Sequence, residues 1–202
     1  MRLKNIKKYT PGFNIHDIQK KYNLKEVIKL ASNENPFISK DVLSFIKKSN
    51  HKLNLYPDSN PDELHKSLAN TVGHRMTSNN IILGNGSNEI LEFIVRANVD
   101  NKSEVIIPKY SFLVYEIISK LQNAKIIITK PDNDKASENY LGINLESIKE
   151  KITNKTKLIF IANPANPTGT YIKLSEIDNF LKSVPKKTSV IIDEAYYEYL
   201  NP

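Results

Sequence analysis

The chain contains no cysteine, which excludes a disulfide framework, a cysteine-ligated zinc site and a thiol nucleophile together. Metal ligation by histidine is also not expected, because the four histidines lack metal-ligand spacing: His16, His51, His65 and His74. No apolar run approaches the roughly 20 residues of a membrane-spanning helix. The basic N-terminus, residues 1–8, is not followed by the apolar segment of a signal peptide. We therefore expect a soluble, cytoplasmic protein without a metal.

Arginine is also scarce, and the formal net charge of +7 comes almost wholly from lysine. The lysines are scattered among asparagine and isoleucine, and no basic run is interleaved with aromatic residues. This distribution argues against nucleic acid as a partner. With 202 residues, 40% of them hydrophobic, the chain is long enough to bury a core in one domain or slightly more.

Short apolar runs alternate with amphipathic patterns along most of the chain. The apolar runs predict strands at residues 27–30, 81–83, 105–107, 125–129, 158–162 and 190–192. The amphipathic patterns predict helices at residues 16–22, 41–49, 61–72, 87–99, 111–121, 145–152 and 174–183. Such an order indicates an α/β fold with a mostly parallel sheet covered by helices on both faces.

Ligands bind to open α/β sheets at the carboxyl ends of the strands, so the loops there are the candidate sites. The first is Gly84-Asn85-Gly86-Ser87-Asn88-Glu89. Its glycines permit a tight turn, and the amides of the next helix with the Ser87 hydroxyl could hold a phosphate. It is not a dinucleotide fingerprint, since Glu89 stands where the third glycine would fall, nor a Walker loop. The alternative is a helix capped by Ser87.

Two further loops follow predicted strands. Pro108-Lys109-Tyr110 would place Tyr110 at the same edge, where its ring could stack on a flat cofactor or simply pack. The segment 163–169, Asn-Pro-Ala-Asn-Pro-Thr-Gly, displays two asparagine amides, and an amide can donate to a phenolate oxygen. The alternative is a rigid turn that leads into the next helix.

The last predicted strand delivers Asp193 and, three residues later, Tyr196 to the sheet edge. A carboxylate there can hold a protonated ring nitrogen, as in pyridoxal phosphate enzymes, or it can merely cap a helix. Taken together, the four loops offer a phosphate cradle, a ring stack, an oxygen donor and a partner for a ring nitrogen. That combination fits pyridoxal phosphate.

The same motifs carry a resemblance to a known family. The motifs are Leu30-Ala31-Ser32-Asn33-Glu34-Asn35-Pro36, Tyr56-Pro57-Asp58, the Gly84–Glu89 loop, Asn166-Pro167-Thr168-Gly169 and Asp193-Glu194-Ala195-Tyr196. In these motifs the sequence resembles the class I/II aminotransferases of the aspartate-aminotransferase fold (fold type I), and within them the histidinol-phosphate aminotransferases. The resemblance implies that residues 1–50 form an N-terminal arm and part of the small domain. Residues 51–202 would be the N-terminal part of the large cofactor-binding domain.

The resemblance also implies a role for each matching residue. Gly86, Ser87 and Asn88 would hold the cofactor phosphate, and Tyr110 would stack on its ring. Asn166 and Tyr196 would contact its phenolic oxygen, and Asp193 would pair with the ring nitrogen. Tyr56 would reach the cofactor of the partner subunit in a homodimer, and Asn33 would lie on the substrate side.

Some positions depart from the family pattern. Ala165 stands where a second asparagine is usual, and Lys109 where threonine is common. Ile38-Ser39 replaces a frequent Gly-Pro. None of these changes removes a principal cofactor contact, although Lys109 beside Tyr110 leaves the substrate preference open.

The family's Schiff-base lysine and its anion-binding arginines lie beyond the motifs that this sequence contains, so no catalytic residue is assigned. We expect an incomplete, inactive portion of an enzyme that transfers an amino group between L-histidinol phosphate and 2-oxoglutarate in histidine biosynthesis. The alternatives are another class I/II aminotransferase, an amino-acid-phosphate decarboxylase, or a non-catalytic remnant.

Overall fold

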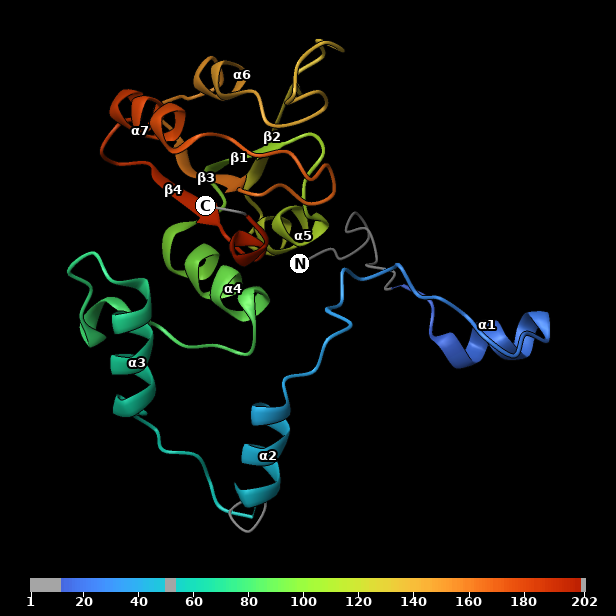
Figure 1. Ribbon diagram of the computed structural model, residues 1–202. Helices are drawn as coiled ribbons and strands as arrows, with labels where there is room; N and C mark the ends of the chain where they lie inside the picture. The colour runs from blue at the N-terminus through green and yellow to red at the C-terminus, as the bar shows by residue number, and fades with distance from the viewer. Residues whose placement is uncertain (1–11, 50–53, 201–202) are drawn as a thin grey trace. The chain divides into compact units, whose positions relative to one another are not determined.

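The computed structural model describes residues 12–49 and 54–200, and it divides the chain into two compact units (Figure 1). Within the described residues, the N-terminal unit ends at residue 82 and the larger unit covers residues 83–200. The division at residue 50 between small-domain and large-domain segments, which the family resemblance implies, stays a prediction.

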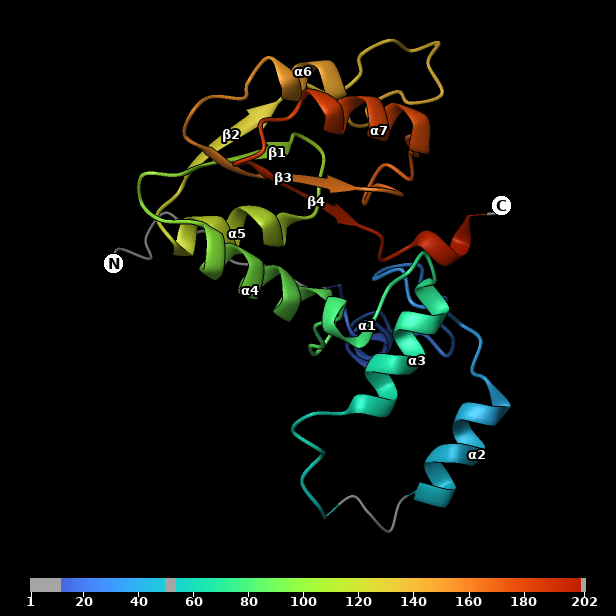
Figure 2. The same ribbon diagram turned by 90° about the vertical axis from the view of Figure 1, so that its left-hand side faces the viewer.

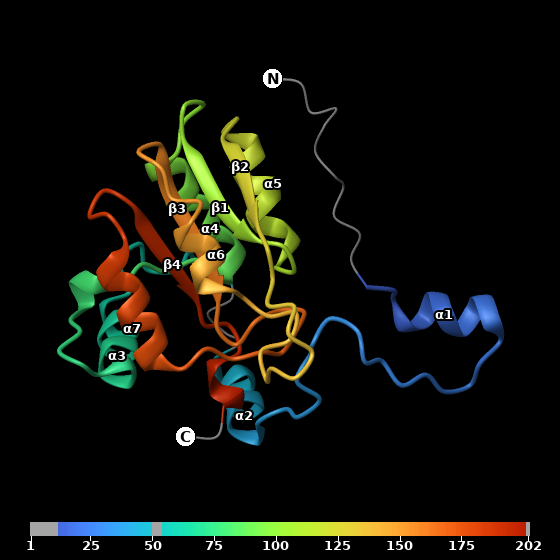
Figure 3. The same ribbon diagram turned by 90° about the horizontal axis from the view of Figure 1, so that it is seen from above.

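The larger unit is built on a four-stranded sheet. Its strands are β1 (Glu104–Pro108), β2 (Lys125–Thr129), β3 (Thr156–Ala162) and β4 (Ser189–Asp193). They lie side by side in the order β2-β1-β3-β4, and every neighbouring pair is parallel (Figure 3). Each pair of successive strands is joined through a helix, as parallel pairing requires. The predicted parallel α/β sheet is therefore confirmed.

Helices cover both faces of this sheet (Figure 2). One face packs against α4 (Ser87–Asn98) and α5 (Leu113–Leu121), and the other against α6 (Leu145–Lys149) and α7 (Leu174–Ser183). Because side chains alternate along a strand, Val105 and Ile107 enter the first core and Ile106 enters the second. The central strands are consequently buried on both faces, which explains their uninterrupted apolar sequences.

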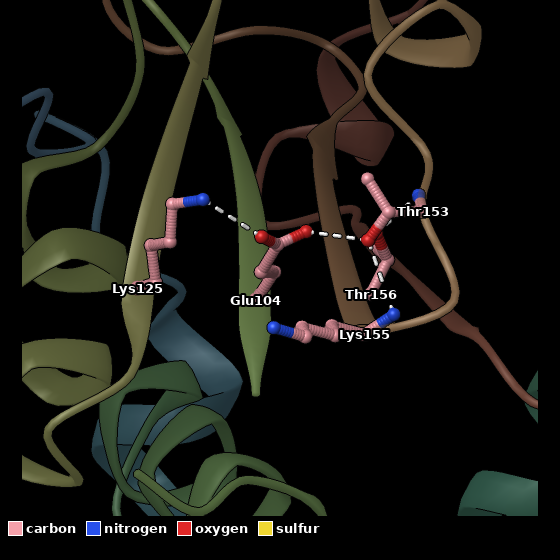
Figure 4. Close-up of polar contacts among 5 residues, drawn as sticks. All are labelled: Glu104, Lys125, Thr153, Lys155 and Thr156. Carbon is pink, nitrogen blue, oxygen red and sulfur yellow. Dashed lines mark hydrogen bonds and ion pairs between the residues drawn. The ribbon is translucent and has the colours of Figure 1, made fainter. Parts of the chain in front are cut away.

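At the amino end of the sheet, the buried carboxylate of Glu104, which is 5% exposed, links neighbouring segments through hydrogen bonds. Thr153 Oγ1 donates to its Oε2 at 2.6 Å, and Lys125 Nζ donates to its Oε1 at 2.9 Å (Figure 4). The hydrogen bond from Thr153, followed by that from Lys125, lowers the pKa of Glu104 below its ordinary value. These contacts join β1 to β2 and to the loop before β3, at the edge opposite the candidate site.

The N-terminal unit is helical in its described part. It contains α1 (Ile15–Tyr22), α2 (Lys40–Ser49), α3 (Asp62–Val72) and a 3-10 turn, η3 (Ser78–Asn80). The strands predicted at residues 27–30 and 81–83 are wrong: within the described residues neither segment forms a strand or pairs with one. A short apolar run becomes a strand only where a neighbouring backbone supplies hydrogen bonds.

The predicted helices are observed with small differences at their ends. The helix predicted from residue 111 begins at Leu113, and the one predicted at 145–152 ends at Lys149. A final 3-10 turn, η4 (Tyr197–Tyr199), follows β4. Within the described ranges, none of the helices is long and apolar enough to cross a membrane.

Candidate cofactor-binding site

A cavity of about 90 Å³ lies at the carboxyl edge of the sheet. It brings together residues from the start of α4, the start of α5 and the loops after β3 and β4. Four of the predicted cofactor-binding residues line it: Ser87, Asn166, Asp193 and Tyr196. The other lining residues are Phe112, Tyr115, Ala162, Pro164 and Ala195. Segments that are more than 100 positions apart in sequence thus meet at one edge, as the sequence predicted.

The start of α4 has the properties of an anion site. Gly86 is the N-cap and has a φ of 75°, a conformation that suits glycine, and no side chain caps the helix. Ser87 is the first helical residue, so the alternative in which Ser87 caps the helix is wrong. The Glu89 carboxylate instead accepts from the Asn85 backbone nitrogen at 2.7 Å and holds the loop. Uncapped helix amides beside a serine hydroxyl are suited to a phosphate.

Asp193 ends β4, and both of its carboxylate oxygens accept a hydrogen bond. The Ala195 backbone nitrogen donates to Oδ1 at 3.2 Å, and the Tyr115 hydroxyl donates to Oδ2 at 2.6 Å. Burial of Tyr115, and then its hydrogen bond to Asp193, raises the pKa of the phenol well above its ordinary value. The phenol therefore keeps its proton and acts as the donor.

Sequence reasoning did not assign Tyr115 to the site. The signal was present in the helix pattern, because Tyr115, Ile118 and Ser119 share the buried face of α5. A tyrosine on such a face needs a partner for its hydroxyl. What the pattern could not show is that this partner lies 78 residues away in sequence.

The loop after β3 presents one asparagine to the cavity, not two. Asn163 is only 3% exposed, and its amide donates to the Ile172 carbonyl oxygen at 2.9 Å and accepts from the Ile172 nitrogen at 2.8 Å. The prediction that both amides are displayed is therefore wrong for Asn163, because a buried amide must find partners within the protein. Asn166 does reach the cavity, and its Nδ2 lies 3.5 Å from the Tyr196 hydroxyl.

The remaining predicted residues of the larger unit lie outside this cavity lining. Tyr110 follows β1, is 38% exposed, and has the Lys109 Nζ 5.4 Å from its ring centroid. Asn88 is exposed in the first turn of α4. Ala165, which departs from the family pattern, is buried in the core beneath α7. The cofactor contacts of Tyr110 and Asn88, like those of the residues that line the cavity, stay predictions.

Asn33 and Tyr56 belong to the N-terminal unit. Both are exposed, Tyr56 completely, and Asn33 has a positive φ of 50°. Their contacts with substrate and with a partner subunit's cofactor stay predictions. Among the described residues, no group of three or more histidine, aspartate or glutamate side chains could hold a metal ion.

A larger cavity, of about 480 Å³, lies between α6, α7 and the loops that follow β2 and β3. Its lining includes the acidic residues Asp132, Glu146 and Glu176, and it shares no residue with the cavity at Asp193. None of the predicted site residues lines it, so size alone does not identify the site here.

Comparison with known proteins identifies the class of protein that this fold and site define. The family model for aminotransferase class I and II matches residues 25–202. The chain belongs to this family, and its fold is that of the aspartate aminotransferases.

Among curated proteins, it is similar to histidinol-phosphate aminotransferase 1 of Idiomarina loihiensis, with 39% identity over 201 residues. It is 38% identical to histidinol-phosphate aminotransferase 2 of Carboxydothermus hydrogenoformans. Each alignment covers 98% of this chain and 52% of the relative, so the chain spans about half the length of these proteins.

Solved structures agree on the fold. The histidinol-phosphate aminotransferase of Clostridium acetobutylicum is 31% identical with a TM-score of 0.69, over 83% of this chain and 47% of that one. The histidinol-phosphate aminotransferase of Sinorhizobium meliloti, solved in complex with pyridoxal-5'-phosphate, is 22% identical with a TM-score of 0.81. That alignment covers 94% of this chain and 50% of the other.

Proposed function

We propose that this chain forms the cofactor-binding part of a pyridoxal-phosphate-dependent aminotransferase. The observation that carries the proposal is the convergence of Ser87, Asn166, Asp193 and Tyr196 on one cavity at the carboxyl edge of the sheet. The family's cofactor has one phosphate, one phenolic oxygen and one ring nitrogen, and the site offers a different kind of group for each. When bound, pyridoxal phosphate supplies a ring that accepts electrons from the substrate.

Each side chain has a role that follows from its chemistry. Asp193 can accept a hydrogen bond from a protonated ring nitrogen and stabilise its positive charge. The Asn166 amide and the Tyr196 hydroxyl can both donate to a phenolate oxygen. The Gly86 turn, the α4 amides and the Ser87 hydroxyl can hold the phosphate, with Asn88 beside them. Tyr110 would stack on the ring, and Asn33 would lie on the substrate side.

For the whole protein we propose L-histidinol phosphate as the amino donor and 2-oxoglutarate as the acceptor. The curated relatives named above support this choice, since both are histidinol-phosphate aminotransferases. We further propose a homodimer in which Tyr56 reaches the phosphate of the partner subunit's cofactor. This arrangement is consistent with the complete exposure of the Tyr56 side chain.

The proposal is tested by genetic complementation. A gene that carries this coding sequence and spans the full length of the curated relatives, expressed in a bacterium that lacks histidinol-phosphate aminotransferase, should restore growth without histidine. Asp193→Asn should abolish growth, because a neutral amide cannot stabilise the charged ring nitrogen. The matched control is Asp178→Asn, on an exposed face of α7, which should grow normally. Absence of growth with the unchanged protein present in the cells would contradict the proposed donor.

A further inference from the structure

We propose that Tyr115 is a positioning residue, whose hydroxyl holds the Asp193 carboxylate in one orientation. The proposal deepens the proposed function and rests on it where it concerns the ring nitrogen. It begins from the 2.6 Å hydrogen bond from the Tyr115 hydroxyl to Asp193 Oδ2. That separation is typical of a hydrogen bond from a hydroxyl to an ionised carboxylate.

The Tyr115 ring is fixed by the packing around it. It is completely buried and stacks on Phe160 of β3, with ring centroids 4.5 Å apart and planes within 3°. The Phe112 ring meets it edge-on at 5.8 Å, with an interplanar angle of 90°. Because both contacts hold the ring, its hydroxyl is a fixed point against which the Asp193 side chain is set.

The Asp193 carboxylate can still accept a hydrogen bond from a ligand. One donor occupies each oxygen, Tyr115 on Oδ2 and the Ala195 nitrogen on Oδ1. A carboxylate offers about four lone-pair sites, so the group can accept a further hydrogen bond. Asp193 lines the cavity, and a ring N–H placed there can therefore add to the two donors without displacing them.

The cavity has few charged groups. Among the described residues that line it there is no lysine or arginine, and the titratable ones are Tyr115, Tyr196 and Asp193. Burial and the neighbouring carboxylate raise the pKa of Tyr115, so the phenol remains a neutral donor throughout the physiological pH range. A neutral donor orients the carboxylate without placing a positive charge beside it, so no formal cation in the described lining competes with a ring nitrogen.

The first test needs no cofactor. In the unliganded chain at neutral pH, proton NMR should show the Tyr115 hydroxyl as a downfield resonance in slow exchange with water. Tyr115→Phe should remove it, whereas Tyr171→Phe should not, since the Tyr171 hydroxyl makes no hydrogen bond to the described part of the chain. Asp193→Asn should move the resonance upfield, because an amide oxygen is a weaker acceptor. A resonance that is absent or indifferent to Asp193→Asn would overturn the proposal, even if Tyr115→Phe does not fold.

The second test follows the ring nitrogen. Deoxypyridoxine phosphate lacks the aldehyde of pyridoxal phosphate, so it occupies the site without reacting with this lysine-rich chain. Its ultraviolet spectrum reports protonation of the ring. In Tyr115→Phe the bound ring should lose its proton about one pH unit lower than in the unchanged chain or in Tyr171→Phe. An unchanged ring titration would overturn the proposal.

The two tests separate the two claims. If the hydroxyl resonance responds to Asp193→Asn but the analogue does not bind, the contact between Tyr115 and Asp193 stands and the cofactor assignment is wrong. If the analogue binds and its ring titrates identically in Tyr115→Phe, the cofactor assignment stands and the positioning role is wrong.

Discussion

The side chain of Asn163 exchanges two hydrogen bonds with the backbone of Ile172, one to its carbonyl oxygen at 2.9 Å and one from its nitrogen at 2.8 Å. The pair closes the loop that follows β3. The Asn163 nitrogen also donates to the Asp193 carbonyl oxygen at 2.9 Å, so the same residue ties this loop to the end of β4. Asn163 therefore places Asn166 without itself reaching the cavity.

This arrangement predicts different effects for the two asparagines. Asn163→Ala would leave two buried backbone groups unpaired and should lower the free energy of unfolding by about 1–3 kcal/mol. Asn166→Ala, at a half-buried position on the cavity, should weaken binding of deoxypyridoxine phosphate with a smaller effect on stability. Chemical denaturation and calorimetric titration of both variants provide the measurements. Equal losses of stability in the two variants would contradict the assigned roles.

If the start of α4 binds the phosphate, a substitution there should weaken binding only of a ligand that carries the phosphate. Ser87→Ala removes a hydroxyl donor and should weaken binding of deoxypyridoxine phosphate by about tenfold, as expected for a hydrogen bond to a charged group. Binding of deoxypyridoxine without its phosphate should be unchanged. Calorimetry with the two ligands makes the comparison within one variant. A loss that is equal for both ligands would place the phosphate elsewhere.

The buried Glu104 predicts a pH-dependent stability. Its pKa in the folded chain is lowered from the ordinary value of 4.5, so it stabilises the fold above that pH, and this contribution is lost as the pH falls through the lowered value. Glu104→Gln should reduce the free energy of unfolding at neutral pH by about 1–3 kcal/mol. The difference from the unchanged chain should shrink in acid.

Denaturation curves between neutral and acid pH measure this difference. The control is Glu138→Gln, at an exposed carboxylate with no hydrogen bond or ion pair in the part of the chain that the structure describes. It should leave stability nearly unchanged. A Glu104→Gln deficit that persists undiminished in strong acid would show that the carboxylate's charge is not what stabilises the fold.

The sequence allowed the sheet and its covering helices to be predicted because their signals are local. Runs such as 158–162 and amphipathic segments such as 174–183 carry their periodicity within a few residues. The segments 27–30 and 81–83 are also rich in apolar residues but lack a partner strand among the described residues, and strand pairing is not a local property. Local pattern thus predicts elements better than it predicts pairing.

The site shows the same limit. Asp193, Asn166 and Ser87 could be placed at one edge because strand ends in a parallel sheet meet there. The identity of the donor to Asp193 could not be predicted, since it depends on the rotation of α5 against β3 and on the Tyr115–Phe160 stack. The structural role of Asn163 was missed for a related reason: burial of a single amide in a loop is set by the packing of Ile172, not by the Asn-Pro motif.

The central claim is that this chain binds the ring of pyridoxal phosphate through Asp193, and one titration tests it most directly. Deoxypyridoxine phosphate is titrated calorimetrically into the unchanged chain, Asp193→Asn and Asp178→Asn, and the ultraviolet spectrum of each complex is recorded. We expect one site per chain, a protonated ring in the unchanged chain and in Asp178→Asn, and a ring that loses its proton in Asp193→Asn. Failure of the folded, unchanged chain to bind the analogue, or an identical ring spectrum in all three proteins, would contradict the account.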